Sequence, residues 1–218
     1  KDFWIHEGFQ SFMDTLYLEH LGKKDAYFAA MKGRARRTRN MQPVAPREAK
    51  FAYEVYLAAP DFIQSDGDIY GKGAVVLHTL RYLIGDDAFF RSLRKMAYPT
   101  PAMERMTDGR QTRLVDTEDF RRIAEAESKM KLDWFFEVYL RQPKLPKLRS
   151  TKLDLRDENR QSMLLEWQTP NSMPFPMPVE VIVNGKPQRV EMKNGKGSIT
   201  YTGEAPTIDP KGWILRAQ

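Results

Sequence analysis

A histidine and a glutamate, His6 and Glu7, stand side by side near the start of the chain, in the segment DFWIHEGFQSFMD. Imidazole and carboxylate groups bind zinc and also act as general bases. In a zinc peptidase helix with the pattern H-E-x-x-H, a second histidine one helical turn later brings both imidazoles to one metal ion. That position is Gln10 here, so the motif is incomplete. Glu7 can be a metal ligand only if its partners come from elsewhere.

The other two histidines, His20 and His78, do not complete a zinc site by their spacing. His6 and His20 lie on one predicted helix, where about four turns, or roughly 21 Å, separate them. His78 falls within an apolar helical pattern, where a histidine is more often a hydrogen-bonded core residue than a ligand. Spacing alone therefore assembles no complete metal site.

A second candidate feature is Tyr70, which the sequence Gly71-Lys72-Gly73 follows. Each glycine inside a helix costs about 1 kcal/mol relative to alanine. We therefore expect another backbone or a ligand to approach closely at Gly71 and Gly73, where a side chain would be in the way. The sequence has no motif of other enzyme classes: it contains no cysteine nucleophile, no G-x-S-x-G serine-hydrolase motif, no Walker loop and no G-x-G-x-x-G dinucleotide motif.

Helical periodicity of the apolar residues predicts the elements that must position these side chains. The chain has Gly22 after the first of these segments, Gly85-Asp86 between two others, and an aromatic-rich stretch over Leu132 to Leu140. The expected helices cover residues 3–21, Lys24 to about Arg37, residues 49–57, a buried helix from about Ala74 to Ile84, the helix that follows Gly85-Asp86, and two helices from an N-cap at Thr117 onward.

Beyond the prolines at 143 and 146 the periodicity changes to two, as in β-strands. Val179, Val181 and Val183 alternate with other residues, and Asn-Gly pairs at 184–185 and 194–195 are typical of hairpin turns. The sequence thus predicts an α+β chain in two domains, a helical part over residues 1–146 and a small antiparallel β domain over residues 147–218.

Composition is that of a folded protein, with 41% hydrophobic and 29% charged residues, and no apolar run approaches the length of a membrane span. The absence of cysteine leaves the compartment open. Much of the net charge of +6 lies in KGRARRTR, residues 32–39. No aromatic residues interrupt this run, which argues against nucleic acid as a partner. One alternative is a non-catalytic binding module whose surface from Arg34 to Arg39 contacts an acidic partner.

Three segments resemble one family. FWIHEGFQSFMD resembles the W-L-N-E-G-F-A-x-Y-x-E stretch of the aminopeptidase N family of zinc metallopeptidases, which are gluzincins. IYGKGAVVLHTLRYLIGDDAF resembles the family segment S-Y-x-K-G-A-x-V-L-x-x-L. FPMPVEVIVNGK and IDPKGWILR are similar to the small β-sandwich domain that follows the catalytic domain in this family. The matches occur in the family's order and extend over nearly the whole chain.

The resemblance implies a zinc aminopeptidase, with Glu7 as the third zinc ligand and Tyr70 as the donor that stabilises the oxyanion. A zinc-activated water would attack the first peptide bond of peptides with a free N-terminus. The chain would comprise the helical half of a thermolysin-like catalytic domain and the β-sandwich. The zinc histidines, the general base and the segment that binds the substrate amine would precede Lys1, so we expect this chain alone to be inactive.

His6 occupies a position at which the family commonly has asparagine. Successive helical residues point about 100° apart, so we expect His6 to point away from Glu7 and not to bind the metal.

Overall fold

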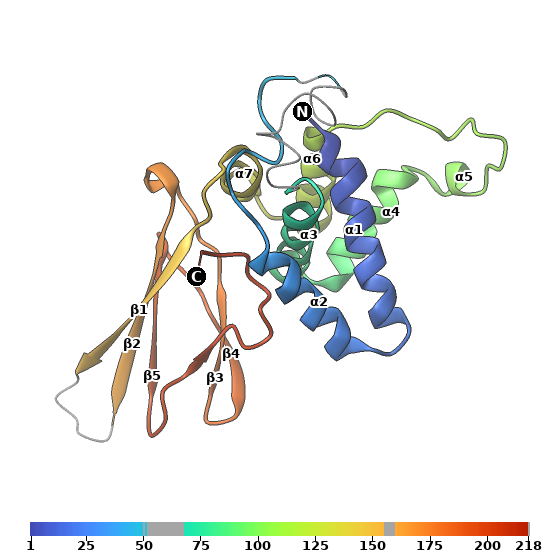
Figure 1. Cartoon of the computed structure of the whole chain (residues 1–218). Helices are drawn as coiled ribbons and strands as arrows, with labels where there is room; N and C mark the ends of the chain where they lie inside the picture. The colour runs from blue at the N-terminus through green and yellow to red at the C-terminus, as the bar shows by residue number, and fades with distance from the viewer. Residues whose placement is uncertain (50, 52–67, 155–159, 218) are drawn as a thin grey trace.

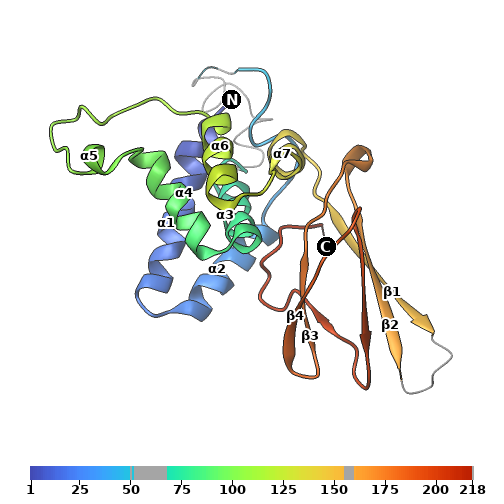
Figure 2. The same cartoon turned by 180° about the vertical axis from the view of Figure 1, so that it is seen from behind.

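The computed structural model describes residues 1–49, 51, 68–154 and 160–217. Helices gather on one side of the molecule and strands on the other, and the C-terminal segment runs between them (Figures 1 and 2). The predicted α+β arrangement, in which a helical part precedes the strands, is confirmed. The strands begin at Lys147. The division into two domains at this residue stays a prediction.

The helical part is built around one buried helix. Its elements are α1 (Phe3–His20), α2 (Lys24–Arg36), α3 (Gly71–Ile84), α4 (Asp86–Ala97), α5 (Pro101–Glu104), α6 (Thr117–Ser128), α7 (Asp133–Phe136) and the π-helical turn η3 (Glu137–Arg141). Almost every residue of α3 is buried, because α1, α2 and α4 pack around it. A helix that is apolar on several faces requires such cover. The helix expected over residues 49–57 lies almost entirely outside the described residues.

The predicted helix boundary at Gly85 is confirmed, whereas the predicted N-cap at Thr117 is not. Gly85 has a φ of +81° and both ends α3 and begins α4, as the sequence predicts. The N-cap of α6 is Asp116 and not Thr117, so that prediction was wrong. The Asp116 carboxylate accepts a hydrogen bond from the backbone N–H of Asp119 at 2.8 Å, and the Asp119 carboxylate accepts one from that of Asp116 at 3.0 Å. This reciprocal capping box satisfies both N–H groups.

Thr117 instead joins α6 to the start of α1. Its hydroxyl donates to the Asp2 carboxylate at 2.6 Å and accepts a hydrogen bond from the indole Nε1 of Trp4 at 2.9 Å. Trp4 is fully buried, so its indole N–H needs a partner inside the protein. The threonine that looked like a cap therefore fixes the beginning of the helix that carries Glu7.

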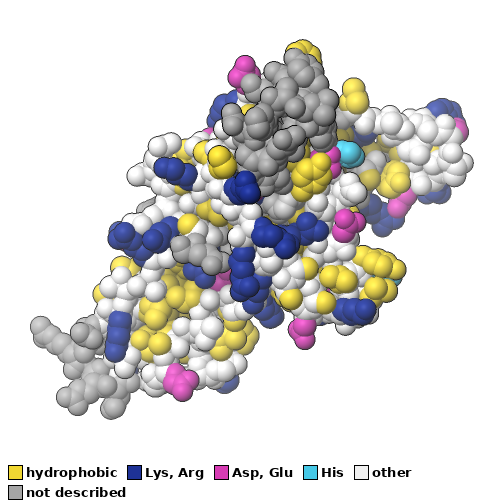
Figure 3. Space-filling view, in the orientation of Figure 1, with side chains coloured by type: hydrophobic (Ala, Val, Ile, Leu, Met, Phe, Trp, Pro, Cys, Tyr) yellow, Lys and Arg dark blue, Asp and Glu magenta, His cyan; other side chains and the backbone are white. Residues whose placement is uncertain are grey.

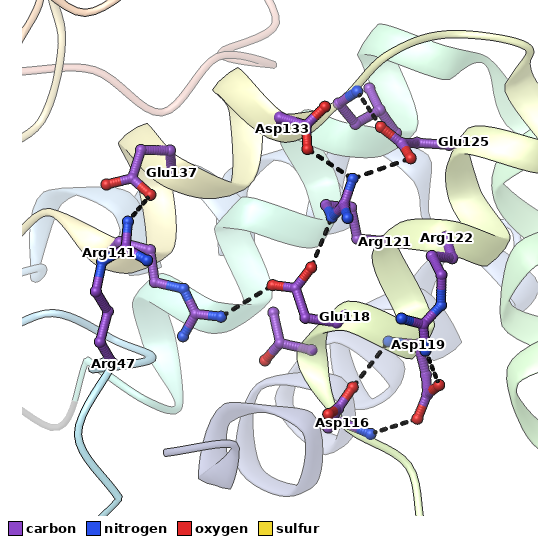
Figure 4. A network of polar contacts seen from close by, with 12 residues as sticks. Arg47, Asp116, Glu118, Asp119, Arg121, Arg122, Glu125, Asp133, Glu137 and Arg141 are labelled. Atoms are coloured by element: carbon purple, nitrogen blue, oxygen red, sulfur yellow. Dashed lines mark hydrogen bonds and ion pairs between the residues drawn. The ribbon is translucent and has the colours of Figure 1, made fainter.

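Charged side chains reinforce the contact between α6 and the elements that follow (Figure 4). Arg121 of α6 forms ion pairs with Glu118 at 2.8 Å, with Glu125 at 3.0 Å and with Asp133 at the start of α7 at 2.7 Å. Arg141, in the last turn before the strands, pairs with Glu118 at 3.2 Å. Such networks hold neighbouring elements in one arrangement, although single exposed pairs add little stability.

The strands form two three-stranded antiparallel sheets. One sheet has the order β1 (Lys147–Asp154), β2 (Gln161–Gln168) and β5 (Lys196–Tyr201), and the other has the order β4 (Lys186–Val190), β3 (Val179–Val183) and β6 (Thr207–Ile208). Asn184 and Gly185 connect β3 and β4 with φ angles of +49° and +76°, which is the hairpin turn that the sequence predicts. The alternating valines of β3 are buried.

One contiguous hydrophobic core continues from the helices into the sheets. The predicted aromatic-rich core segment is confirmed, because Phe135, Tyr139 and Leu140 are fully buried. The hydroxyl of Tyr139 donates to the carbonyl oxygen of Leu215 at 2.7 Å, so π-helical turn η3 holds the C-terminal segment.

Candidate active site

The close crossing of α1 and α3 positions the candidate residues. A Cβ atom on Gly73 would lie 2.9 Å from the Cα atom of Gly8, a distance that real side chains do not reach. The expected close approach of a second backbone is therefore confirmed at Gly73. At Gly71 no described atom lies within 4 Å of the corresponding Cβ position, so no described backbone approaches there and the approach of a ligand stays a prediction. The crossing brings Glu7, beside Gly8, next to the start of α3.

Glu7 and Tyr70 are hydrogen-bonded across this crossing. Glu7 is 6% exposed, and Tyr70 is partly buried at the N-terminal end of α3. Burial raises the pKa of Tyr70, and the negative charge of Glu7 and the hydrogen bond to it raise this pKa further. The phenol is consequently protonated at neutral pH and acts as a hydrogen-bond donor.

His6 lies against the same carboxylate. Its imidazole Nδ1 is 3.3 Å from the Oε1 atom of Glu7, although its side chain is 75% exposed. The prediction that His6 points away from Glu7 was therefore wrong, because the ring turns back along the helix surface to reach its neighbour. A group in this position can orient a carboxylate ligand without being a ligand itself.

Two further residues hold the segment around Tyr70 in place. The amine of Lys72 is completely buried and donates to the carbonyl oxygen of Pro143 at 2.9 Å. The Asp68 carboxylate accepts hydrogen bonds from the backbone N–H groups of Arg39 and Asn40, at 3.0 and 2.8 Å. From the sequence, Ser65 to Asp68 is expected to supply the turn and N-cap of the helix that follows, and no role is predicted for Lys72. The Asp68 side chain instead binds the segment after α2, and Ser65 to Gly67 lie outside the described residues. A lysine within a buried helical pattern was the available signal for Lys72.

The other histidines stay apart from Glu7, as expected from their spacing. His20 is exposed at the end of α1, where its ring stacks on Tyr17. His78 is fully buried. Its Nε2 lies 3.2 Å from the carbonyl oxygen of Gly212, and its Nδ1 lies 2.7 Å from the Tyr27 hydroxyl. Since a carbonyl only accepts, Nε2 carries the proton and Nδ1 accepts from Tyr27.

Burial lowers the pKa of His78 to about 3, so the ring is neutral. The ring also stacks on Trp213 at a centroid distance of 4.5 Å. The interpretation of His78 as a hydrogen-bonded core histidine is confirmed.

Within the part of the chain that the structure describes, no group of three or more His, Cys, Asp or Glu side chains could hold a metal ion. A catalytic zinc takes about three protein ligands and leaves one position open. The chemistry of Glu7 fits one of these ligands, because its carboxylate is buried and has a phenol and an imidazole as neighbours.

The basic segment of residues 32–39 does not form one continuous surface. Arg34 is directed toward α1, where its Nε donates to the Thr15 hydroxyl at 3.1 Å. Lys32 donates to the carbonyl oxygen of Pro210 at 2.8 Å, and Arg36 borders a cavity next to the strands. Its cations thus face different neighbours. No described helix is both long enough and apolar enough to cross a membrane.

Neither a protein-family model nor a curated protein matches the chain. Among solved structures, the chain is similar to Legionella pneumophila aminopeptidase A in complex with aspartic acid, with a TM-score of 0.62 and 17% sequence identity. The similarity covers 94% of this chain and 22% of that chain, so this chain spans about a fifth of that protein's length. The chain therefore shares the fold of part of an aminopeptidase.

Proposed function

We propose that this chain is part of a zinc-dependent aminopeptidase of the gluzincin type, in which Glu7 binds the metal and Tyr70 stabilises the oxyanion. The observation that carries this proposal is the hydrogen bond between Glu7 and Tyr70 across α1 and α3. These two side chains belong to segments far apart in the sequence, each of which resembles a different motif of the same family. The shared fold with an aminopeptidase supports the same assignment.

Glu7 would supply one ligand to the zinc ion, and two further ligands would come from residues beyond this chain. When bound, zinc would act as a Lewis acid toward water and the substrate carbonyl. His6 would hold the Glu7 carboxylate in orientation through the contact at 3.3 Å. The expected substrates are peptides with a free N-terminus.

Tyr70 would act on the charge that develops in the reaction. Its raised pKa keeps the phenol protonated, so it can donate a hydrogen bond to the oxygen that becomes negative when the peptide carbonyl is attacked. A donor already held beside a metal ligand is positioned for that oxygen without reorganisation. Removal of one such donor typically lowers kcat by about a hundredfold to a thousandfold.

The test is Tyr70→Phe in the complete gene product, with hydrolysis of aminoacyl-amide substrates as the readout. We expect kcat to fall by about a hundredfold or more while the zinc content is unchanged. Tyr17→Phe is the matched control, because Tyr17 is 58% exposed on the surface of α1. Activity of Tyr70→Phe equal to that of Tyr17→Phe would refute the role of Tyr70.

The chain of 218 residues offers a second test, since it contains no H-E-x-x-H motif. We expect it to release no amino acid from the same substrates when it is purified alone with added zinc. Measurable zinc-dependent release by this chain would show that the site is assembled from other residues.

A further inference from the structure

A cavity of about 450 Å³ lies between α2, the start of β1 and the C-terminal segment. Its charged lining residues are Lys32, Arg36, Lys147, Asp209 and Arg216, four basic side chains and one acidic. They come from three separate segments of the chain. In the space-filling view, Lys and Arg side chains gather between the helical part and the strands (Figure 3). Its volume is in the range of small-molecule sites, roughly 300 to 1,000 Å³.

The acidic residue of the lining is engaged by its own loop. The carboxylate of Asp209 accepts hydrogen bonds from the backbone N–H groups of Trp213 at 2.8 Å and Ile214 at 3.2 Å. Asp209 is 7% exposed, and burial raises its pKa to about 6. Its charge therefore offsets only part of the positive charge of the cavity, and mainly that of Arg216.

Lys32 forms a fixed part of the wall. Its amine donates to the carbonyl oxygen of Pro210, and its aliphatic stem lies over Gly212, where a Cβ atom would come within 2.8 Å of Cε. Gly212 has a φ of +69°, so a glycine both permits the turn and leaves room for the lysine. The cation is thereby held at the cavity by the loop that contains Asp209.

The other three cations form no ion pair with a described carboxylate, and only the charge of Arg216 is partly offset, by Asp209. Among the described residues, Arg36, Lys147 and Arg216 take part in no ion pair, whereas other arginines of the chain do: Arg81 with Glu19 and Asp86, Arg91 with Glu127, Arg94 with Glu104, and Arg121 with Glu118, Glu125 and Asp133. A concave surface with an excess of one charge concentrates ions of the opposite sign. Guanidinium and ammonium groups are the side chains that recognise phosphate oxygens.

We propose that this cavity is a binding site for a small organic phosphate, whose phosphate group is held by Arg36, Lys147 and Arg216. The rest of the lining includes aliphatic residues and no aromatic side chain. It therefore offers no surface for stacking of a nucleic-acid base. The volume leaves room for a short carbon skeleton beside the phosphate. Neither Glu7 nor Tyr70 lines this cavity. The proposal is therefore independent of the peptidase assignment.

The test is isothermal titration calorimetry of the full chain at low ionic strength, with glycerol 3-phosphate as the probe. We expect saturable binding, and no binding of glycerol, which lacks the phosphate. Arg36→Gln and Arg216→Gln should each weaken the affinity by about tenfold or more, because each removes a charge-assisted hydrogen bond. Arg36 is exposed on the last turn of α2, so its replacement leaves the fold intact.

Arg105→Gln is the matched control. Arg105 is exposed beside α5, and its replacement changes the net charge by the same amount outside the cavity. An unchanged affinity of this variant is expected. The proposal is overturned if glycerol 3-phosphate shows no saturable binding in the millimolar range, if Arg105→Gln weakens it as much as Arg36→Gln does, or if sodium acetate binds equally well, which would indicate a site for carboxylates.

Discussion

Gly8 and Gly73 bring the backbones of α1 and α3 into direct contact, so closely that a Cβ atom on Gly73 would lie 2.9 Å from the Cα atom of Gly8. This contact places the residue before Gly8, Glu7, beside Tyr70 at the start of α3, and the two side chains are hydrogen-bonded. Gly8 and Gly73 therefore matter to the candidate site as much as its polar groups do, because they allow the two helices to come close enough for Glu7 and Tyr70 to meet.

Gly73→Ala should destabilise the protein, because the new methyl group overlaps the α1 backbone and the two helices must separate. We expect the free energy of unfolding to fall by about 1–3 kcal/mol, the usual cost of overpacking. Urea denaturation measures this change. Separation of the helices should also lengthen the Glu7 to Tyr70 hydrogen bond.

Gly71→Ala is the matched control for the same substitution in the same helix. No described atom lies within 4 Å of its Cβ position, and alanine favours a helix more than glycine does. Its free energy of unfolding should be unchanged or larger by up to about 1 kcal/mol. Equal losses for Gly71→Ala and Gly73→Ala would mean that the contact with Gly8 is not the cause.

Thr117→Val should loosen the start of α1. The variant keeps the shape of the side chain but leaves the indole N–H of the buried Trp4 without its acceptor. An unsatisfied buried donor costs about 1–3 kcal/mol, and we expect a loss of unfolding free energy of this size. Thr112→Val, at an exposed position, should change it little. Comparable chemical denaturation curves for Thr117→Val and Thr112→Val would contradict this role of Thr117.

The buried His78 should make the protein less stable in acid. Its pKa is about 3 in the folded protein and near 6.5 when unfolded, so between these values the unfolded state binds more protons. Its contribution to stability is complete above pH 6.5 and is lost progressively as the pH falls toward 3. Between about pH 6.5 and 4.5 the loss from His78 alone is roughly 2 kcal/mol.

His78→Gln separates this effect from the other titrating groups. The variant should be less stable than the parent at neutral pH, because it disturbs the packing against Trp213. Its unfolding free energy should nevertheless change less between about pH 7 and 4.5, since the carboxyl groups contribute equally to both proteins. Parallel pH profiles of the two proteins would show that His78 is not the titrating group.

Local patterns were sufficient to predict most of the fold. The apolar spacing that marks α1 and α3, the glycine at position 85 and the Asn-Gly turn at 184–185 act through neighbouring residues, so the sequence reveals them directly. The cap of α6 was misassigned because Asp116 and Thr117 are both good caps. The choice between them depends on Asp2 and Trp4, which are distant in the sequence and engage Thr117.

The candidate site was less accessible to such reasoning. Glu7 and Tyr70 were selected through their resemblance to family motifs. The cost of a glycine within a helix predicted the close approach of another backbone at Gly73, but not which residues it would bring together. The contact of His6 with Glu7 depends on a side-chain rotation that helix periodicity does not specify. The cavity lined by Arg36, Lys147 and Arg216 joins three remote segments, and a run of basic residues does not indicate which of them will face it.

The most direct test of the central claim is the zinc content of the complete gene product and of its Glu7→Gln variant, measured by inductively coupled plasma mass spectrometry after dialysis. Glu19→Gln, at the other end of α1, serves as a control with the same chemical change. We predict about one zinc ion per protein in the parent and in Glu19→Gln. The Glu7→Gln variant should lose most of its zinc, because an amide is a much weaker ligand than a carboxylate. Full zinc occupancy in Glu7→Gln, or a parent protein without zinc, would contradict the assignment of Glu7 as a metal ligand.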